Sequence, residues 1–239
     1  MKHPVFAISG VVGGVATFRW LRDAVKANGR ECHIYSAPGF DGRSVVPELT
    51  PKDLAFEVQH DMDAIYADKV HLIAHCGGGP ISLHLARLLP GRIASITFIG
   101  SYFDPPTPDW LGKFDELESL GLDGFARARI HMVVEDPALH ERTVQAYLDT
   151  LASGLEAARS IERFLSKYSH RSQLFECEVP KAFVVGLADK MVAPAYQINY
   201  GSKAGAKIFA LEGIGHSAHM EAPERVAKFG EHFWTAVET

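Results

Sequence analysis

The stretch Val70-His71-Leu72-Ile73-Ala74-His75-Cys76-Gly77-Gly78-Gly79-Pro80 decides how this chain folds. Residues 70–74 form a largely apolar run, which is typical of a strand buried on both faces of a sheet. Three glycines and a proline follow, and apolar residues then continue at helical spacing to about residue 89. The stretch therefore predicts a strand, a sharp turn at Cys76 and a helix, the repeating unit of a parallel sheet covered by helices.

The same alternation of short apolar runs and longer amphipathic stretches extends along most of the chain. Strands are predicted over 5–9, 32–37, 70–74, 93–100, 181–187 and 207–211. Helices are predicted over about 18–28, 51–67, 78–89, 195–204 and 222–237. The fold class that follows is α/β, with a doubly wound, mostly parallel sheet of about six strands joined by right-handed crossovers.

One long interval between residues 103 and 179 contains no predicted strand. It opens with Asp104-Pro105-Pro106-Thr107-Pro108, a stiff connector because each proline fixes φ and removes a hydrogen-bond donor. Four helical patterns follow it. We expect residues 1–103 and 179–239 to form the core domain, and residues 104–178 to form a helical cap, or lid, inserted after the fourth strand.

Length and composition exclude several classes of protein. The 239 residues can bury a substantial core, and 47% hydrophobic with 22% charged residues is typical of a globular protein. A formal net charge of −5 argues against a nucleic-acid binder. No apolar run approaches the ~18–20 residues needed to cross a membrane, and the start is too short for a signal peptide. Three widely spaced cysteines exclude a disulfide scaffold, so we expect a cytoplasmic location.

The turn at Cys76 meets the steric requirements of a site for a catalytic nucleophile. A nucleophile on a sharp strand-to-helix turn needs small residues two positions to either side, and Ala74 and Gly78 meet that need. The helix start leaves the Gly77 N–H free for an oxyanion and favours a thiolate over a thiol. A buried structural cysteine beside a glycine turn is an alternative. A phosphate-binding loop is disfavoured, because no lysine follows the glycines and the GxGxxG spacing is absent.

Two later segments supply partners for Cys76. The predicted strand over 181–187 leads into Asp189, and the one over 207–211 leads into a glycine-rich loop carrying His216. The carboxyl ends of parallel strands meet at one edge of a sheet, so these side chains are expected to lie together. Their order in the chain is nucleophile, acid, base. This predicts a catalytic triad of Cys76, Asp189 and His216.

With these motifs the chain resembles the α/β-hydrolase superfamily with a helical lid, from Val5 to about Trp234. The segment Ile8-Ser9-Gly10-Val11 resembles the first oxyanion loop of that family. The resemblance implies that the oxyanion hole consists of the backbone N–H groups of Val11 and Gly77.

The chain departs from the family pattern in three respects. The family's usual nucleophile is serine, and here it is Cys76; the histidine of the oxyanion loop is replaced by Ser9. The chain also begins at what resembles the family's third strand, which predicts a six-stranded sheet with a more exposed edge.

A cysteine nucleophile narrows the expected chemistry. Beside an imidazole a thiol exists largely as a thiolate, which is both a good nucleophile and a good leaving group. A tetrahedral intermediate from an amide therefore tends to collapse back, whereas thioesters, aryl or enol esters and lactones can react on. Polyester synthases and dienelactone hydrolases resemble this chain in placing cysteine at the turn. We expect an esterase- or thioesterase-type hydrolase; the alternatives are an acyltransferase and a non-catalytic ligand-binding protein on the same fold.

Residues near the predicted triad are assigned supporting roles. Tyr102, Phe103 and Trp110 are predicted to bind substrate, because pockets in such folds form between sheet and lid. Asp104 is the alternative to Asp189 as the acid. His75 is expected to pack beside the sheet, in keeping with the usual role of the residue before the nucleophile. His219 is expected to support its loop.

The expected partner is a small-molecule acyl substrate, free or bound to a carrier as a thioester, and not nucleic acid or a membrane. The expected oligomeric state is a monomer or homodimer. The histidines, apart from His216 and His219, are scattered without metal-ligand spacing, so no metal and no cofactor are predicted.

Overall fold

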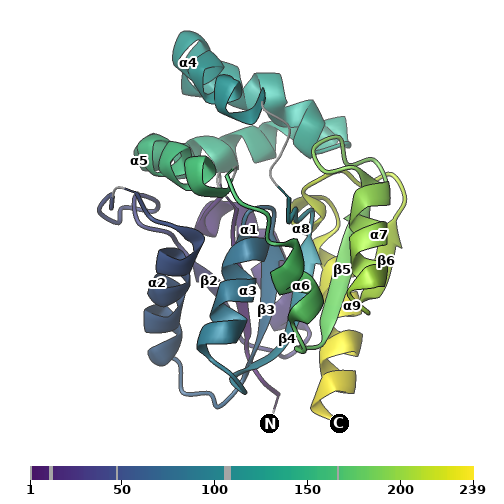
Figure 1. Ribbon diagram of the computed structural model, residues 1–239. Coiled ribbons are helices and arrows are strands. Elements are labelled where there is room, and N and C mark those ends of the chain that lie inside the picture. The colour runs from purple at the N-terminus through teal and green to yellow at the C-terminus, as the bar shows by residue number, and fades with distance from the viewer. Residues whose placement is uncertain (1, 11–12, 47, 105–108, 166) are drawn as a thin grey trace.

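The computed structural model describes residues 2–10, 13–46, 48–104, 109–165 and 167–239, and over 109–118, 151–155 and 160–165 it describes the main chain alone. Six strands form one sheet in the order β2-β1-β3-β4-β5-β6, and each pair of neighbouring strands in it is parallel (Figure 1). The strands are β1 (Val5–Ile8), β2 (Cys32–Tyr35), β3 (Val70–His75), β4 (Ile93–Ile99), β5 (Lys181–Gly186) and β6 (Lys207–Leu211). The predicted doubly wound sheet is confirmed.

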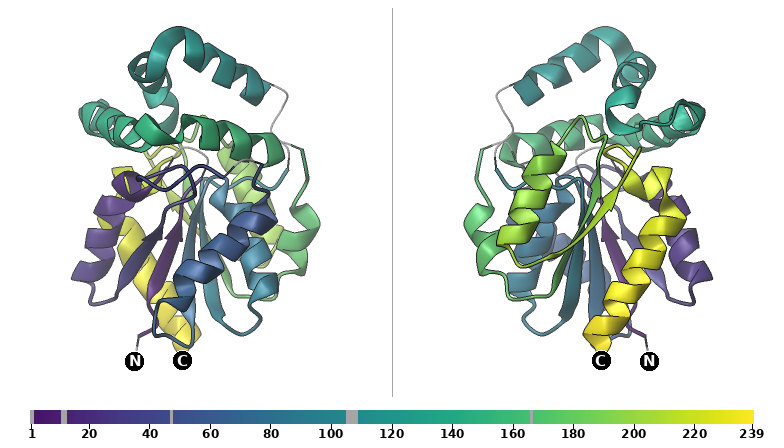
Figure 2. Two further views of the ribbon diagram at one scale, coloured as in Figure 1. Left: turned by 90° about the vertical axis from the view of Figure 1, so that its left-hand side faces the viewer. Right: turned by 90° about the vertical axis from the view of Figure 1, so that its right-hand side faces the viewer.

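Helices cover both faces of the sheet, as continuous apolar strands require (Figure 2). One face packs against α1 (Val15–Ala27), the short α8 (Ala218–Glu221) and α9 (Pro223–Glu238). The other packs against α2 (Pro51–Asp63), α3 (Gly78–Leu88), α6 (Arg171–Glu176) and α7 (Pro194–Lys203). Neighbouring residues of β3 alternate between the faces, so Leu72 joins one core and Ile73 the other.

The strand order places the end of β3 at the centre of the molecule. From β1 the chain crosses to β2 on one side, then returns to β3 on the other side of β1. Such a reversal leaves a crevice beyond the carboxyl ends of the strands, where α/β proteins bind their ligands. The turn at Cys76 follows β3 directly and therefore lies in this region.

The interval that lacks predicted strands is helical in its described part. It contains α4 (Asp109–Val133), a short 3-10 helix (Pro137–Leu139), α5 (His140–Leu165) and α6. Gly121, at φ 65°, interrupts α4 with a kink that only glycine adopts easily. Figure 1 shows α4 and α5 beyond the carboxyl edge of the sheet, while α6 lies beside the sheet with Leu174 buried in the core. Within the described residues, no helix has the length and apolar content needed to cross a bilayer.

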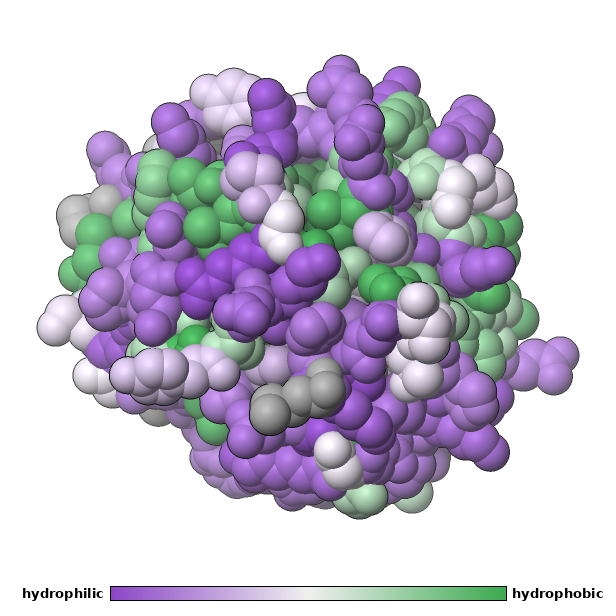
Figure 3. Space-filling model, turned by 90° about the horizontal axis from the view of Figure 1, so that it is seen from below, coloured by the Kyte–Doolittle hydropathy of each residue, from purple (hydrophilic) through white to green (hydrophobic). Residues whose placement is uncertain are grey.

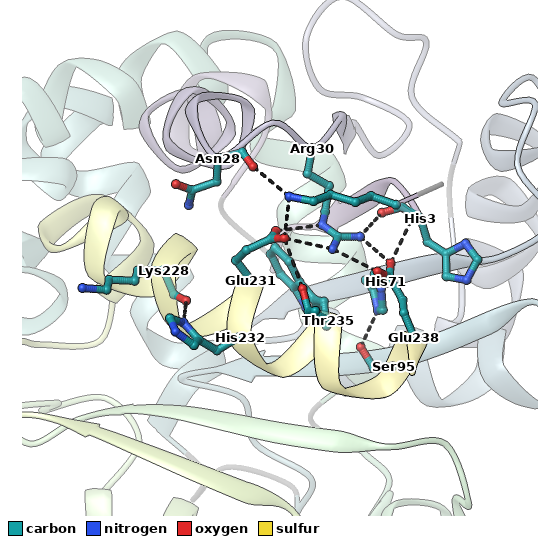
Figure 4. Close-up of polar contacts among 12 residues, drawn as sticks. His3, Asn28, Arg30, His71, Ser95, Lys228, Glu231, His232, Thr235 and Glu238 are labelled. Carbon is teal, nitrogen blue, oxygen red and sulfur yellow. Dashed lines mark hydrogen bonds and ion pairs between the residues drawn. The ribbon is translucent and has the colours of Figure 1, made fainter.

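Both termini lie at the amino edge of the sheet, opposite α4 and α5 (Figure 1). The face seen from below is largely hydrophilic, with apolar patches gathered in part of it (Figure 3). A set of paired groups lies at this edge, which we call the amino-edge network: Arg30, His71, Ser95, Glu231 and Glu238 (Figure 4). The buried Arg30 guanidinium donates to Glu238 at 2.6 Å and to Glu231 at 2.9 Å, which fastens α9 to the start of the sheet.

Candidate active site

Cys76 occupies the strained turn that the sequence predicts. Its φ is 53°, in the left-handed region that a side chain with a Cβ adopts only at a cost of about 1–3 kcal/mol. The backbone is held there by two hydrogen bonds: Cys76 N donates to Ile99 O at 3.0 Å, and Gly79 N donates to Cys76 O at 3.1 Å. Cys76 is half-buried, so its thiol is neither sealed in the core nor fully solvated.

Glycines around the turn leave room for it. A Cβ on Gly10 would lie 2.7 Å from the Cβ of Cys76 and 3.0 Å from the Gly77 nitrogen. A Cβ on Gly78 would lie 2.5 Å from Ile8 O. Gly10 therefore allows close approach to the Gly77 N–H, the group expected to face an oxyanion. Val11, the other expected donor, lies outside the described residues.

The carboxylate of Asp189 is held by four hydrogen bonds. It accepts from His216 Nδ1 at 3.0 Å and from Gln197 Nε2 at 2.8 Å. The backbone N–H groups of Met191 and Val192 each donate to its other oxygen at 2.8 Å. Gln197 is fully buried on α7, and no sequence pattern marks it as part of the site. Its amide fixes the oxygen of Asp189 that His216 uses.

The electrostatics favour a protonated His216. Burial alone would lower the pKa of His216, but the charge and hydrogen bond of Asp189, together with the neighbouring Cys76, outweigh it and raise this pKa. The structure thus places His216 against the carboxylate of Asp189, with 3.0 Å between Nδ1 and Oδ2, and close to Cys76.

Two further histidines surround His216. The ring centroid of His75 lies 4.8 Å from that of His216 and 4.3 Å from that of His219. His219 stacks on Phe18 at 4.4 Å. Burial lowers the pKa of His219 to about 3, and burial together with the two neighbouring rings lowers the pKa of His75 well below its ordinary value. At neutral pH, therefore, only His216 of the three carries charge.

Asp104, the alternative acid, has other partners. It accepts hydrogen bonds from Ser169 at 2.8 Å, from Arg171 at 2.8 Å and from Tyr200. Burial would raise the pKa of Asp104, but these donors lower it. The carboxylate thus connects the residues before α4 with those before α6, while Asp189 is the acid bonded to His216.

The residues expected to contact substrate lie in different surroundings. Phe103 is fully buried, with its ring 5.1 Å from Phe98 and 6.0 Å from Phe183 in the core. Tyr102 is half-buried, and the side chain of Trp110 lies outside the described residues.

A residue that the sequence did not single out, Tyr147, projects from α5 toward the site. Its hydroxyl lies 3.5 Å from Ser217 Oγ, and its ring is buried. Burial raises the pKa of Tyr147, and the nearby Cys76 adds to this effect. In the sequence Tyr147 belongs to the apolar face of a helix, so only the packing of α5 identifies it.

Among the described residues, no group of three or more histidine, cysteine, aspartate or glutamate side chains is arranged to hold a metal ion.

Comparison with known proteins agrees with the fold. The family model described as "Alpha/beta hydrolase family" matches residues 10–229. The chain is 25% identical over 215 residues to 3-oxoadipate enol-lactonase 1 of Acinetobacter baylyi, covering 85% of this chain and 78% of that protein. It is 27% identical over 179 residues to the dihydrolipoyllysine-residue acetyltransferase component of the acetoin cleaving system of Pseudomonas putida. That match covers 69% of this chain and 45% of the relative's length.

Solved structures share the architecture at low sequence identity. A thermophilic esterase from Thermogutta terrifontis superposes with a TM-score of 0.87 at 17% identity, over 100% of this chain and 92% of that one. The enol-lactonase from Burkholderia xenovorans LB400 superposes with a TM-score of 0.84 at 17% identity, over 98% of this chain and 92% of that one. At such identities the likeness shows the fold alone.

Proposed function

Because the chain belongs to the alpha/beta hydrolase family, we propose that it hydrolyses activated acyl compounds, namely esters, thioesters or lactones, through an acyl-cysteine on Cys76. One observation carries the proposal. Cys76 stands in the left-handed turn after β3 and lies close enough to His216 to raise its pKa, and His216 bonds Asp189 at 3.0 Å. This is the nucleophile–base–acid relation that acyl transfer requires.

The first half of the proposed reaction forms the acyl-enzyme. The Cys76 thiolate attacks the carbonyl carbon, a C–S bond forms, and the carbonyl electron pair moves to oxygen. The Gly77 N–H donates to that oxyanion, together with the expected N–H of Val11. When the oxyanion collapses, the bond to the leaving oxygen or sulfur breaks, and the leaving group takes the proton of the His216 imidazolium.

The second half releases the acid. His216, now neutral, takes a proton from a water molecule while the water oxygen attacks the acyl carbon. The tetrahedral intermediate collapses, the C–S bond breaks and Cys76 returns as a thiolate beside the reprotonated His216. Asp189 holds the imidazole in the tautomer that both halves need and stabilises the imidazolium.

The substrate class follows from the leaving ability of sulfur. A tetrahedral intermediate on cysteine expels the better leaving group, so enolates, phenolates and thiolates depart readily, whereas amide nitrogen leaves only when it is protonated first. The enol-lactonase named among the relatives acts on a compound of this activated kind, which favours enol esters and lactones as first substrates to test.

We further propose that residues 104–178 contain the lid of a core formed by residues 1–103 and 179–239. Two contacts favour α4 and α5 as its covering part. Ser217 N, beside His216, donates to Val133 O at 2.9 Å, and Tyr147 of α5 lies at Ser217 Oγ. In this arrangement Tyr147 contributes to the wall of the acyl pocket.

Acyl transfer to an amine or alcohol is a second candidate, because an acyl-cysteine is itself an activated thioester. The Pseudomonas putida relative is named as an acetyltransferase component, although the chain spans less than half of its length. Product analysis with and without an added alcohol distinguishes the two activities.

The test is a panel of p-nitrophenyl esters, acyl thioesters and enol lactones, read by turnover and by intact-protein mass spectrometry. We expect an acyl adduct on the wild type that is absent from Cys76→Ala, whereas Cys177→Ala retains it. Cys76→Ser is expected to fold but to lose most thioesterase activity, because a hydroxyl depends fully on His216 for deprotonation. A wild type with neither adduct nor turnover on any activated donor would leave a ligand-binding protein as the better interpretation.

A further inference from the structure

Glu221 is a carboxylate that the proposed chemistry does not use, although it lies close to the base. It ends α8, and its Oε1 accepts a hydrogen bond from Gly215 N at 2.8 Å, one residue before His216. Its Oε2 accepts from Glu135 N at 2.8 Å and from Asp136 N at 3.4 Å, in the turn between α4 and α5. One side chain therefore joins the loop of the base to the α4–α5 segment.

The residue after His216 is also bonded to this part of the chain. Ser217 N donates directly to Val133 O at 2.9 Å, so residues 215 and 217 are both fastened to the same turn. The surfaces are close-packed, because a Cβ on Gly215 would lie 3.0 Å from Glu221 Oε1 and 3.2 Å from Glu135 N. The backbone on both sides of His216 is thus hydrogen-bonded, directly or through Glu221, to the end of α4 and the turn after it.

Only a carboxylate suits this place. Its two oxygens are both acceptors, and each faces backbone N–H donors from a different segment. A glutamine has one acceptor oxygen, so its NH₂ group would be placed against N–H donors on one side or the other. An aspartate is one methylene shorter and cannot span both segments from α8.

We propose that Glu221 is a positioning residue that couples the placement of the α4–α5 segment to the alignment of His216 with Cys76. The proposal rests on the proposed role of His216 as the base. It predicts that loss of the bridge at Glu221 lowers catalysis without removing any group that touches the substrate.

The experiment compares Glu221→Gln and Glu221→Ala with the wild type and with Glu224→Gln, an exposed acid at the start of α9 that serves as the matched control. Hydrogen exchange of peptides covering residues 132–137 and 213–217 reports on the two ends of the bridge. The rate of Cys76 alkylation and the separate values of kcat and KM report on the site. Glu221→Gln keeps the side-chain volume and serves if the alanine variant folds poorly.

In Glu221→Ala we expect faster exchange in both peptides, and in Glu221→Gln in at least one. Both variants should lose about tenfold in kcat, with slower Cys76 alkylation and KM changed less than kcat, while Glu224→Gln matches the wild type. The proposed coupling is wrong if hydrogen exchange in the Glu221 variants is unchanged. It is also wrong if exchange is faster but the rate of Cys76 alkylation and kcat stay at their wild-type values. A wild type without turnover or Cys76 reactivity refutes the proposed function instead, and the bridge is then decided by exchange of the two peptides.

Discussion

The two histidines of β3 lie on the same face of one strand, four residues apart, yet their surroundings differ. At the amino edge both ring nitrogens of His71 have partners: Nδ1 lies 2.8 Å from Ser95 Oγ and Nε2 lies 3.0 Å from Glu238 Oε1. At the carboxyl edge His75 is equally buried, but its Nε2 has no hydrogen-bond partner among the described residues. The same is true there of His219 Nδ1 and Ser9 Oγ.

The difference shows how the fold separates stability from chemistry. Buried polar groups that are fully paired stabilise a fold, whereas unpaired ones cost about 1–3 kcal/mol each and are retained where the arrangement has another use. The amino edge is paired throughout its network. The carboxyl edge combines unpaired groups with the strained backbone of Cys76, as expected of a reactive site.

The largest effect is expected from a pair of variants that each remove one buried histidine, His216 at the carboxyl edge and His71 at the amino edge. We expect His216→Ala to lower kcat/KM about a thousandfold, because it removes the proposed base. His71→Ala should keep kcat/KM within about threefold but lower the free energy of unfolding by about 2–3 kcal/mol. Ester turnover and urea unfolding measure both. Equal losses of activity in the two variants would contradict the separation.

Arg30→Met tests the amino-edge network alone. The guanidinium is fully buried, and removing it leaves Glu231 and Glu238 without their main counter-ion, so we expect a loss of about 3 kcal/mol of stability with kcat unchanged. The control is Arg22→Met, which removes only an exposed pair with Asp23 and should change stability by less than about 1 kcal/mol. Similar unfolding curves for the two variants would show that the network contributes little.

The pH dependence of stability sharpens the comparison. Burial lowers the pKa of His71 to about 4, with the hydrogen bond to Glu238 opposing and the charge of Arg30 adding to the effect. An unfolded histidine has a pKa of about 6.5, so between pH 6.5 and 4 the unfolded chain binds the extra proton and stability falls as the pH falls. His71→Gln should reduce this slope by up to about 1.4 kcal/mol per pH unit in urea titrations, and an unchanged slope would place the effect elsewhere.

The raised pKa of His216 makes stability depend on pH in the opposite direction to that of His71. Its contribution to stability is present below the unfolded pKa of about 6.5 and is lost as the pH rises through the folded pKa of about 10.

The smallest expected effect concerns Asp104. Its carboxylate bonds Ser169, Arg171 and Tyr200 rather than His216, so Asp104→Asn should change kcat by less than about threefold. Asp189→Asn should lower kcat by at least a hundredfold, because the imidazole loses its tautomer-fixing partner. Steady-state kinetics on one activated ester is sufficient. A larger loss in Asp104→Asn than in Asp189→Asn would restore Asp104 as the acid.

Local sequence determined most of the framework of this protein. Each strand of the sheet was predicted within a few residues, because continuous apolar runs such as Val70–His75 must be buried on both faces wherever they occur. The turn chemistry around Cys76 was likewise visible, since small residues at fixed offsets are a local steric requirement. The sequence also predicted that Asp189 and His216 lie at the same edge of the sheet as Cys76, because each of the three follows a predicted strand.

Tertiary structure decided everything that depends on which segments meet. Gln197 and Tyr147 stand in helical patterns, and Glu221 lies just before the helix predicted over 222–237, all three without a local signal of a role. Each acquires its place only because α7, α5 and α8 pack around the loops of Asp189 and His216. Phe103 was expected at a pocket, but its ring lies in the core between Phe98 and Phe183. The physical reason is that hydrogen bonding and burial are pairwise properties of distant residues, whereas strand and turn propensities belong to each short segment alone.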